Sequence, residues 1–464
     1  MADDRKRQPI ELSIEDLAFG GEGVGFHEGQ VHFVAGALPG ERVLALAERG
    51  RKRWQRARLL EIIEPSRDRI PPRCSHTALC GGCVYQGLAY PAQIEAKARQ
   101  VRENLARIAG LRLPEAGPPV PAPDPFLYRN KMEFSFAPRT WDPAGIPERP
   151  QPGPALGLHV RGRFDAVFDV HDCALVDPEL NQLIALIRDA AREQGLPAYH
   201  GRDRTGILRH LVVRMSRHTG QWLIALVVRE ESPRLLGVAE LCRRMHPRIA
   251  GFLLWIHSGV ATVARAEREI LLFGEDRIVE RLLDLEFELS ASSFFQTNSA
   301  AAEGLLREIR SMAPEVRLLI DLYCGVGTLG LGLAGSCEEL LGIESVPSAV
   351  ADAERNARRN GISHARFEVA RTESWFREAR PLRPGLVVVD PPRAGLHPKA
   401  LAGLVALAPE TILYVSCNPS TLARDLATLS GEGYEADRMR ILDLFPHTPH
   451  VETVVRLIRR SASP

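Results

Sequence analysis

Cys417 stands where a thiol could act as a nucleophile. It follows the apolar run Ile412–Ser416, which is typical of a buried strand, and it precedes Asn-Pro and a predicted helix that begins near Ser420. A side chain at the carboxyl end of such a strand points into the crevice where doubly wound sheets bind ligands. The dipole of the following helix is expected to lower the pKa of the thiol. A lone cysteine can equally be a small buried hydrophobe, so the residue types leave both interpretations open.

Acidic residues end two further predicted strands, beside a glycine-rich turn. Asp321 precedes Gly325 and Gly327, and Glu344 ends the next strand, 23 residues after Asp321. The glycines let the backbone approach a ligand closely. A carboxylate at about that spacing is suited to binding ribose hydroxyls. Because an acid rather than a basic cluster lies beside the turn, the pattern favours a cationic nucleoside over a pyrophosphate, and S-adenosylmethionine is the obvious candidate.

Two other segments could supply groups for proton transfer. Asp390 follows the apolar run Leu386–Val389, and the two prolines after it fix the backbone. It could face a cofactor or a substrate, or it could simply cap the turn. Near the end of the chain, His447, His450 and Glu452 lie in a proline-containing loop before a last predicted strand. They are candidates for proton transfer, although histidines in such loops are most often structural.

Four cysteines form a pattern that is typical of a metal site. Cys74, Cys80 and Cys83 lie in one loop, in which two glycines separate the last two cysteines, and Cys173 follows 90 residues later. Without a signal peptide, clustered cysteines indicate a metal more often than disulfides. By count, four thiolates suit zinc or an iron–sulfur cluster equally well. We expect a structural role, in which the metal ties the loop to the middle of the chain.

The spacing of apolar runs predicts an α/β protein with three parts. Residues 1–64 carry short alternating runs between glycines, which predicts a small β-barrel. Residues 65–285 predict an α+β module, with an amphipathic helix over 91–110 that we expect to pack on the C-terminal part. Residues 286–464 alternate strands and helices, which predicts a Rossmann-like, doubly wound parallel sheet.

Composition excludes several classes of protein. With 45% hydrophobic and 25% charged residues, the chain falls outside the disordered, collagen-like and small disulfide-rich classes. The charged N-terminus lacks the apolar region of a signal peptide, so we expect a cytoplasmic protein. The net charge of +1 gives no general attraction to nucleic acid. The segment 49–58, however, holds six basic residues and Trp54 and could bind a phosphate backbone, or it could be a solvated edge strand.

Taken together, the motifs resemble a known family. Asp390–Gly395 (DPPRAG), Ile412–Thr421 (ILYVSCNPST) and Leu442–Glu452 (LDLFPHTPHVE) are similar, in sequence and spacing, to the RNA 5-methyluridine (uracil-5) methyltransferases of transfer RNA and 23S ribosomal RNA. The similarity extends to Tyr128–Phe136 (YRNKMEFSF) and Ser293–Asn298 (SFFQTN). The N-terminal part resembles the RNA-binding TRAM barrel of some members.

The resemblance implies a mechanism and a set of site residues. Cys417 would add to carbon 6 of uracil, so that carbon 5 can accept a methyl group from S-adenosylmethionine, and Glu452 would then remove the carbon-5 proton. The uridine must be unstacked to expose its ring, and Phe294 or Phe295 could support it, although we expect at least one of the two in the core. The implied cofactor contacts are Gln296, Tyr323, Gly325, Glu344 and Asp390. The implied metal is a 4Fe-4S cluster on Cys74, Cys80, Cys83 and Cys173.

The predicted function is therefore methylation of carbon 5 of a uridine in 23S ribosomal RNA. The barrel and the cluster together favour ribosomal RNA, and the same reaction on transfer RNA is the alternative. A non-catalytic RNA assembly factor is less consistent with a site that retains Cys417, Asp390 and Glu452. A small-molecule methyltransferase on the same fold is disfavoured by the barrel with its basic segment 49–58. DNA lacks the 2′-hydroxyl that RNA enzymes can read, but no residue of the sequence can be shown to read it. No apolar stripe requires a protein partner, so a monomer is expected.

Overall fold

The computed structural model describes residues 8–48, 53–114, 117–141, 153–261, 263–378 and 382–460. The first of the four sheets in the described residues is a closed barrel with the strand order β1-β2-β3-β5-β4. Alternating apolar side chains such as Leu12, Val34 and Val43 fill its interior, as expected for strands with one buried face. The barrel strands are β1 (Ile10–Leu17), β2 (Glu22–His27), β3 (Gln30–Ala35), β4 (Arg42–Ala47) and β5 (Trp54–Glu64).

The basic segment of the barrel is not an edge strand. Residues 49–52 lie outside the described residues, and the rest of the segment forms the start of β5, which pairs with β3 on one side and β4 on the other. The edge-strand interpretation is therefore wrong for this part. Trp54 is 41% exposed and packs edge-to-face on Phe33 at 5.9 Å, while Arg56 pairs with Glu22 at 2.9 Å.

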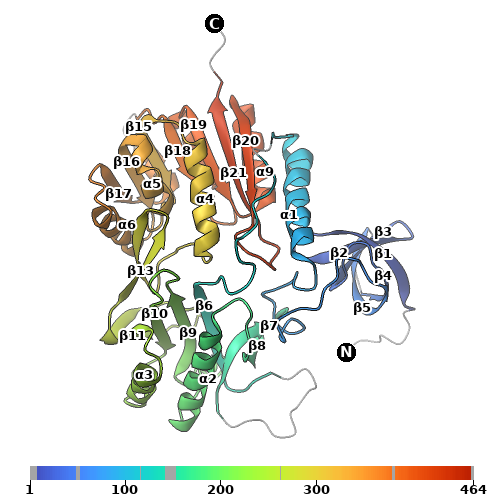
Figure 1. Ribbon diagram of the computed structural model, residues 1–464, viewed down its shortest axis with the longest axis vertical. Helices are drawn as coiled ribbons and strands as arrows, with labels where there is room; N and C mark the ends of the chain where they lie inside the picture. The colour runs from blue at the N-terminus through green and yellow to red at the C-terminus, as the bar shows by residue number, and fades with distance from the viewer. Residues whose placement is uncertain are drawn as a thin grey trace.

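The middle of the chain forms a seven-stranded sheet with the order β12-β11-β10-β9-β6-β7-β8. Helices α2 (Pro178–Glu193) and α3 (Arg234–Met245) pack on one face, where Leu211 and Val213 of β9 point, and Val212 points to the other face (Figure 1). The strands are β6 (Lys131–Ala137), β7 (Ala155–Val160), β8 (Arg163–Asp169), β9 (Leu208–Met215), β10 (Trp222–Val228), β11 (Ile249–Ile256) and β12 (Arg268–Gly274). The hairpin β13 (Arg277–Leu282) and β14 (Leu285–Ser290) leads into the last part of the chain.

The C-terminal part is a second seven-stranded sheet with the order β17-β16-β15-β18-β19-β21-β20. Its first five strands are parallel, whereas β21 runs antiparallel to β19 and to β20. The strands are β15 (Val316–Leu322), β16 (Cys337–Glu344), β17 (Ala365–Val369), β18 (Leu386–Val389), β19 (Thr411–Ser416), β20 (Tyr434–Leu442) and β21 (Glu452–Arg459). The helices are α4 (Ser299–Met312), α5 (Thr328–Gly332), α6 (Pro347–Arg359), α7 (Thr372–Glu378), α8 (Pro398–Leu407) and α9 (Pro419–Gly431). The predicted doubly wound sheet is thus confirmed.

Helix α1 (Tyr90–Asn104) crosses from the cysteine loop to the C-terminal sheet, where it lies beside α9 (Figure 1). Its Ala98 and Val101 are buried in the same core as β15 and β19. The helix ends earlier than the sequence predicts: a single π-helical turn follows to Ala109, and Gly110 closes it with φ +66°. In the described part of the chain, no helix is both long enough and apolar enough to cross a membrane.

Candidate active site

Three of the predicted cofactor residues meet because neighbouring parallel strands end at one level. Leu322 of β15 is in register with Ile343 of β16 and with Val389 of β18. The residues that come next in each chain, Tyr323, Glu344 and Asp390, therefore lie side by side at the carboxyl edge of the sheet. This edge is where open α/β sheets bind their ligands.

Cys417 and Glu452 meet because β21 reverses direction beside β19. Ser416 pairs with Thr453, so the next step of the antiparallel register places Cys417 opposite Glu452. The reversal brings the beginning of β21 to the edge at which the parallel strands end. A thiol and a carboxyl group that are 35 residues apart in the sequence thus face one another.

All seven residues predicted to act on substrate or cofactor line one cavity of about 680 Å³, a size typical of small-molecule sites. The sequence analysis did not assign several others in its wall, notably Arg393, Asp352 and Ser293. The seven predicted residues are Gln296, Tyr323, Gly325, Glu344, Asp390, Cys417 and Glu452.

The carboxylate of Glu344 fixes the glycine-rich turn by a hydrogen bond to its backbone. The backbone N–H of Gly325, where φ is +55°, donates to Glu344 Oε2 at 3.2 Å. The other oxygen, Oε1, accepts bonds from the backbone N–H groups of Ser345 and Val346. Tyr323 also has a positive φ, +64°, which is uncommon for a bulky residue and is expected at a site that the surroundings over-determine.

Asp321 does not lie at the end of its strand, and it does not line the cavity. Strand β15 continues to Leu322, and Asp321 is buried inside it. Its Oδ2 accepts a bond from the backbone N–H of Gly330 at 2.8 Å, and a Cβ at Gly330 would meet that oxygen at 2.7 Å. Burial raises the pKa of Asp321 to about 8. Asp321 is therefore a structural anchor of the turn.

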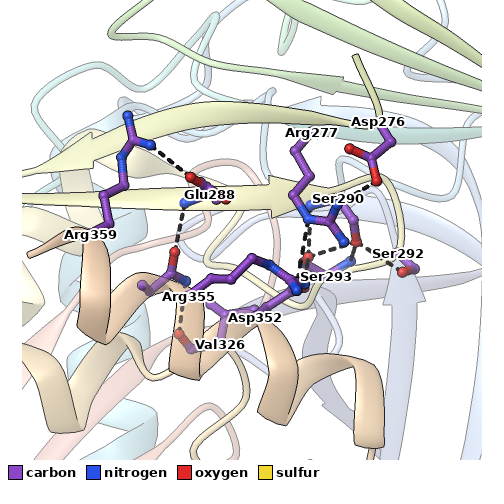
Figure 2. Close-up of polar contacts among 11 residues, drawn as sticks. Asp276, Arg277, Glu288, Ser290, Ser292, Ser293, Val326, Asp352, Arg355 and Arg359 are labelled. Carbon is purple, nitrogen blue, oxygen red and sulfur yellow. Dashed lines mark hydrogen bonds and ion pairs between the residues drawn. The ribbon is translucent and has the colours of Figure 1, made fainter.

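Helix α6 supports two cavity loops through polar side chains that sequence analysis missed. Asp352 Oδ2 accepts a bond from Ser293 Oγ at 2.7 Å, and Asn356 Nδ2 donates to the carbonyl oxygen of Val326 at 3.1 Å. Figure 2 shows the contact of Asp352 with Ser293 and the ion pair of Arg359 with Glu288. Asp352 and Asn356 are almost fully buried. Their spacing of four residues on an amphipathic helix is the one signal that could have indicated that both lie on the same helix face.

The Ser293–Asn298 segment is fixed by the Tyr128–Phe136 segment of the central sheet. Asn130 Nδ2 donates to the carbonyl oxygen of Gln296, and its backbone N–H donates to that of Thr297, both at 2.9 Å. Phe295 is 2% exposed and packs on Phe287 in the core. Phe294 is 68% exposed in the cavity wall. One phenylalanine is thus core, as predicted, and the other is available to a ligand.

The electrostatics of Cys417 differ from the expectation drawn from the following helix. Burial raises the pKa of the thiol to about 12, and the carboxyl groups of Glu452 and Asp390 raise it further, whereas Arg393 lowers it. The thiol pKa is therefore raised and not lowered as predicted, because the thiol is buried and two acids face the sulfur from neighbouring strands. Asn418 caps α9 by accepting a bond from the Ser420 N–H at 3.1 Å.

The two carboxyl groups opposite Cys417 favour their protonated forms. Burial, followed by repulsion from Asp390, raises the pKa of Glu452 well above its ordinary value. Burial raises the pKa of Asp390 to about 7. Glu452 is 2% exposed, and its Oε1 has no hydrogen-bond partner in the structure. A buried and unpaired carboxylate is costly, so this group is ready to hold a proton.

The two candidate histidines have different places. His450 lines the cavity, where its Nδ1 lies 3.0 Å from Arg393 Nη2. Burial lowers the pKa of His450 to about 4, so the ring is neutral and accepts from Arg393. His447 lies outside the cavity lining, with its ring 4.2 Å from that of Phe126 and its backbone bonded to the Gln93 side chain. His447 is therefore structural.

The four predicted metal ligands line a second cavity of about 600 Å³. Burial raises the pKa of Cys83 to about 11 and that of Cys173 to about 12, and the neighbouring thiols add to both shifts. Cys80 Sγ accepts a bond from the Gly82 N–H at 3.3 Å. The described residues contain no group of three or more Cys, His, Asp or Glu side chains arranged to hold a metal ion as they stand.

Comparisons with known proteins identify the family. A family model described as tRNA (Uracil-5-)-methyltransferase matches residues 253–460. The chain is 38% identical to an uncharacterized RNA methyltransferase of Chlorobaculum tepidum, over 97% of this chain and 96% of that protein. It is 36% identical to one of Clostridium acetobutylicum, over 98% and 99% respectively.

A solved structure is similar over the whole chain. The Pyrococcus abyssi tRNA (uracil-54, C5)-methyltransferase, in complex with S-adenosyl-L-homocysteine, superposes with a TM-score of 0.75 and 29% identity, covering 97% of this chain and all of that one. These findings agree with the resemblance that the motifs carry. The chain belongs to the family of S-adenosylmethionine-dependent RNA uracil-5 methyltransferases.

Proposed function

We propose that the protein methylates carbon 5 of one specific uridine through a covalent bond between Cys417 and the base. The observation that carries this proposal is the register that sets Cys417 opposite Glu452 in one cavity. The thiol loses its proton to water, and the thiolate adds to carbon 6, which turns the ring into an enolate with an electron-rich carbon 5. Carbon 5 then takes the methyl group from S-adenosylmethionine, which leaves as S-adenosylhomocysteine. Glu452 then accepts the carbon-5 proton, the ring double bond re-forms and the thiolate leaves.

The charges in the cavity suit this order of events. The thiol is neutral while Glu452 and Asp390 face it, and Arg393 is the nearby group that favours the thiolate. A cationic sulfonium in the same cavity would favour the thiolate further, because opposite charges a few ångströms apart stabilise the ionised form. The raised pKa of Glu452 makes its carboxylate a stronger base, which proton removal from carbon requires.

We propose that S-adenosylmethionine binds at the carboxyl ends of β15, β16 and β18, which lie at one level of the sheet. Glu344 is suited to the ribose hydroxyls, because its carboxylate is already oriented by the turn that contains Gly325. Tyr323, Gln296 and Asp390 complete the contacts implied by the family motifs. The half-buried Asp390 also faces Cys417 and Glu452, so it lies between the cofactor side and the base side of the cavity.

We propose a 4Fe-4S cluster on Cys74, Cys80, Cys83 and Cys173. Four soft thiol donors in one cavity fit iron–sulfur chemistry, and a cluster of several atoms needs less tightly converging ligands than a single ion does. Arg161 holds the loop by donating to the carbonyl oxygens of three of its residues, Thr77, Cys80 and Cys83. When bound, the cluster would supply cross-linking of the two segments rather than a step of the reaction.

We propose 23S ribosomal RNA as the substrate, because the barrel and the four-cysteine pattern occur together in this chain. Transfer RNA is the second candidate, and the likeness to the Pyrococcus abyssi tRNA enzyme favours it. That likeness covers 97% of this chain, so the barrel by itself does not select ribosomal RNA.

The proposal is tested by supplying methyl-labelled S-adenosylmethionine with unmodified 23S ribosomal RNA or transfer RNA and mapping the labelled uridine by mass spectrometry. Label only in transfer RNA would reject the ribosomal assignment. The Cys417→Ala variant should transfer no methyl group and form no adduct with RNA that contains 5-fluorouridine. Cys337→Ala, at a thiol that lines neither cavity, is the matched control. Transfer at the wild-type rate by Cys417→Ala would reject the covalent scheme.

A further inference from the structure

The cysteine-lined cavity adjoins the active-site cavity at Phe294. Ser293 and Phe294 line both cavities. Ser293 is held from two sides: Arg214 of the central sheet donates to its carbonyl oxygen, and its hydroxyl donates to Asp352. Both bonds are buried and hold Ser293, and the next residue, Phe294, places its exposed ring in the wall that the two cavities share. A polymer bound at the active site can therefore continue past Phe294 into the second cavity.

The rim of this second cavity has the chemistry of an RNA-binding groove. Arg129, Lys131 and Arg161 line it together with apolar side chains, among them Met132 and Leu158. Positive charge beside aromatic rings is the combination that binds single-stranded nucleic acid, since phosphates meet the cations and bases stack on the rings, and Phe294 supplies an exposed ring in this lining. The carboxylate that shares the rim, Glu133, is paired with Lys131 at 3.1 Å.

An exposed aromatic ring lies in the chain two residues after Gly162, the last residue of the β7–β8 turn that lines this cavity. Phe164 follows the turn between β7 and β8 and is 90% exposed, the highest value among the large apolar side chains described. The turn itself is rigid, because the Arg161 N–H donates to the Leu79 carbonyl oxygen at 2.8 Å and Cys80 forms a β-bridge with Val160. A ring so exposed on an anchored hairpin has a free face on which an unpaired base can stack.

We propose that the RNA strand next to the target uridine lies along this rim and that Phe164 stacks on one of its unpaired bases. Arg163, adjacent to Phe164 and 51% exposed at its side chain, is placed to meet a phosphate. The proposal concerns the rim and not the thiol end of the cavity, and it rests on the proposed function, since it extends the RNA path from the same active site.

The test is the affinity of the full-length, metal-loaded protein for unmodified transcripts of 23S ribosomal RNA and of transfer RNA. Filter binding in the presence of S-adenosylhomocysteine measures it without catalysis. Phe164→Ala should weaken binding of the substrate transcript by at least about 5-fold, the lower end of one lost base–aromatic stack. The control is Leu236→Ala on α3, a 56% exposed apolar side chain that lines neither cavity.

A kinetic readout separates a contact with RNA from a structural role. Phe164→Ala should raise KM for RNA while kcat and the KM for S-adenosylmethionine stay unchanged. Arg163→Ala should reduce the salt dependence of binding by up to about one phosphate contact. Arg243→Ala, an exposed arginine of α3 paired with Glu240 much as Arg163 is paired with Asp165, should not.

The outcomes separate this inference from the proposed function. If wild-type protein methylates an RNA and Phe164→Ala binds that RNA as tightly as wild type, the stacking proposal is wrong and the proposed function stands. If wild-type protein neither binds nor methylates either RNA, the proposed function is overturned and the inference falls with it. Equal weakening by Phe164→Ala and Leu236→Ala would also overturn the inference, because the effect would not be local.

Discussion

Lys97 on α1 should be essential for the loop that leads to Glu452. Its ammonium group donates to Asp443 Oδ1 at 2.7 Å and to the carbonyl oxygen of Phe445 at 3.0 Å. Both charged side chains are fully buried, with exposures of 1% and 2%. Burial lowers the pKa of Lys97 while Asp443 raises it. The pair therefore joins an N-terminal helix to the catalytic loop in a place that water does not reach.

The Lys97→Met variant keeps the volume and removes the charge, which leaves the carboxylate of Asp443 buried without its partner. Breaking a buried ion pair in this way costs about 3–5 kcal/mol. The double variant Lys97→Met with Asp443→Asn has no charge at this buried pair. The amide oxygen of the new asparagine can still accept the bond that the Phe445 N–H donates to Asp443 Oδ1 at 3.1 Å. It should recover at least about half of the loss, because neutral replacements of a buried pair are often nearly as stable.

Urea unfolding followed by tryptophan fluorescence measures these differences, and Arg317→Met provides the scale for an exposed pair. Arg317 meets Glu339 at 3.2 Å with both side chains about half exposed or more, and its loss should cost no more than about 1 kcal/mol. If Lys97→Met is no less stable than Arg317→Met, or if the double variant is as unstable as the single one, the reasoning is refuted.

Four further outcomes are expected. The Glu452→Gln variant should stop after methyl transfer, so that a covalent protein–RNA complex accumulates on denaturing gels; normal turnover would contradict the assigned base. The transfer rate should rise with pH, because burial raises the pKa of the Cys417 thiol to about 12 and raises that of Glu452, so that both reacting groups gain their basic forms as pH rises, and a flat profile would be inconsistent. Asp321 has a folded-state pKa of about 8, so its stabilisation is complete below about pH 4 and is lost as pH rises through 8. Asp321→Asn should remove up to about 6 kcal/mol of that pH dependence in urea unfolding, and an unchanged dependence would refute it. Finally, Cys173→Ser should lower the iron and sulfide content of protein assembled anaerobically, and a full complement would reject Cys173 as a ligand.

The residues that sequence analysis brought together are those at the ends of apolar strands. The runs before Glu344, Asp390 and Cys417 are short and apolar, and parallel strands place their carboxyl ends at one edge. Strand order was not needed for this prediction, because any neighbouring order would bring those ends to the same crevice. An error of one residue in the predicted end of a strand is enough to misplace a side chain, however. Asp321 was expected at the carboxyl edge of the sheet, but strand β15 runs one residue further, to Leu322.

Interactions between distant segments explain what the sequence could not show. Asp352 bonds to Ser293, 59 residues away, and no local pattern predicts such a partner. The pKa of Cys417 was misjudged for the same reason. The dipole of α9 is visible in the sequence next to the thiol, whereas the two opposing carboxyl groups come from β18 and β21 and meet it only in the folded sheet.

The cysteine loop, α1 and the catalytic loop form one hydrogen-bonded unit, which explains how a segment so far from Glu452 in the sequence can set its position. The backbone N–H groups of Val84 and Tyr85, directly after Cys83, donate to the carbonyl oxygen of His447 at 2.9 and 3.0 Å. Gln93 of α1 accepts from the His447 N–H and donates to the Tyr85 carbonyl oxygen.

His447 has a φ of +66°, a conformation that costs a non-glycine residue about 1 kcal/mol or more and persists only where neighbours impose it. Those neighbours are the residue pair after Cys83 and the amide of Gln93. If the cysteine loop were displaced, the bonds that hold His447 would be lost together, and the strained backbone five residues before Glu452 would be free to relax. The position of Glu452 opposite Cys417 therefore depends on an ordered cysteine loop. This holds even though no cysteine of that loop lines the active-site cavity.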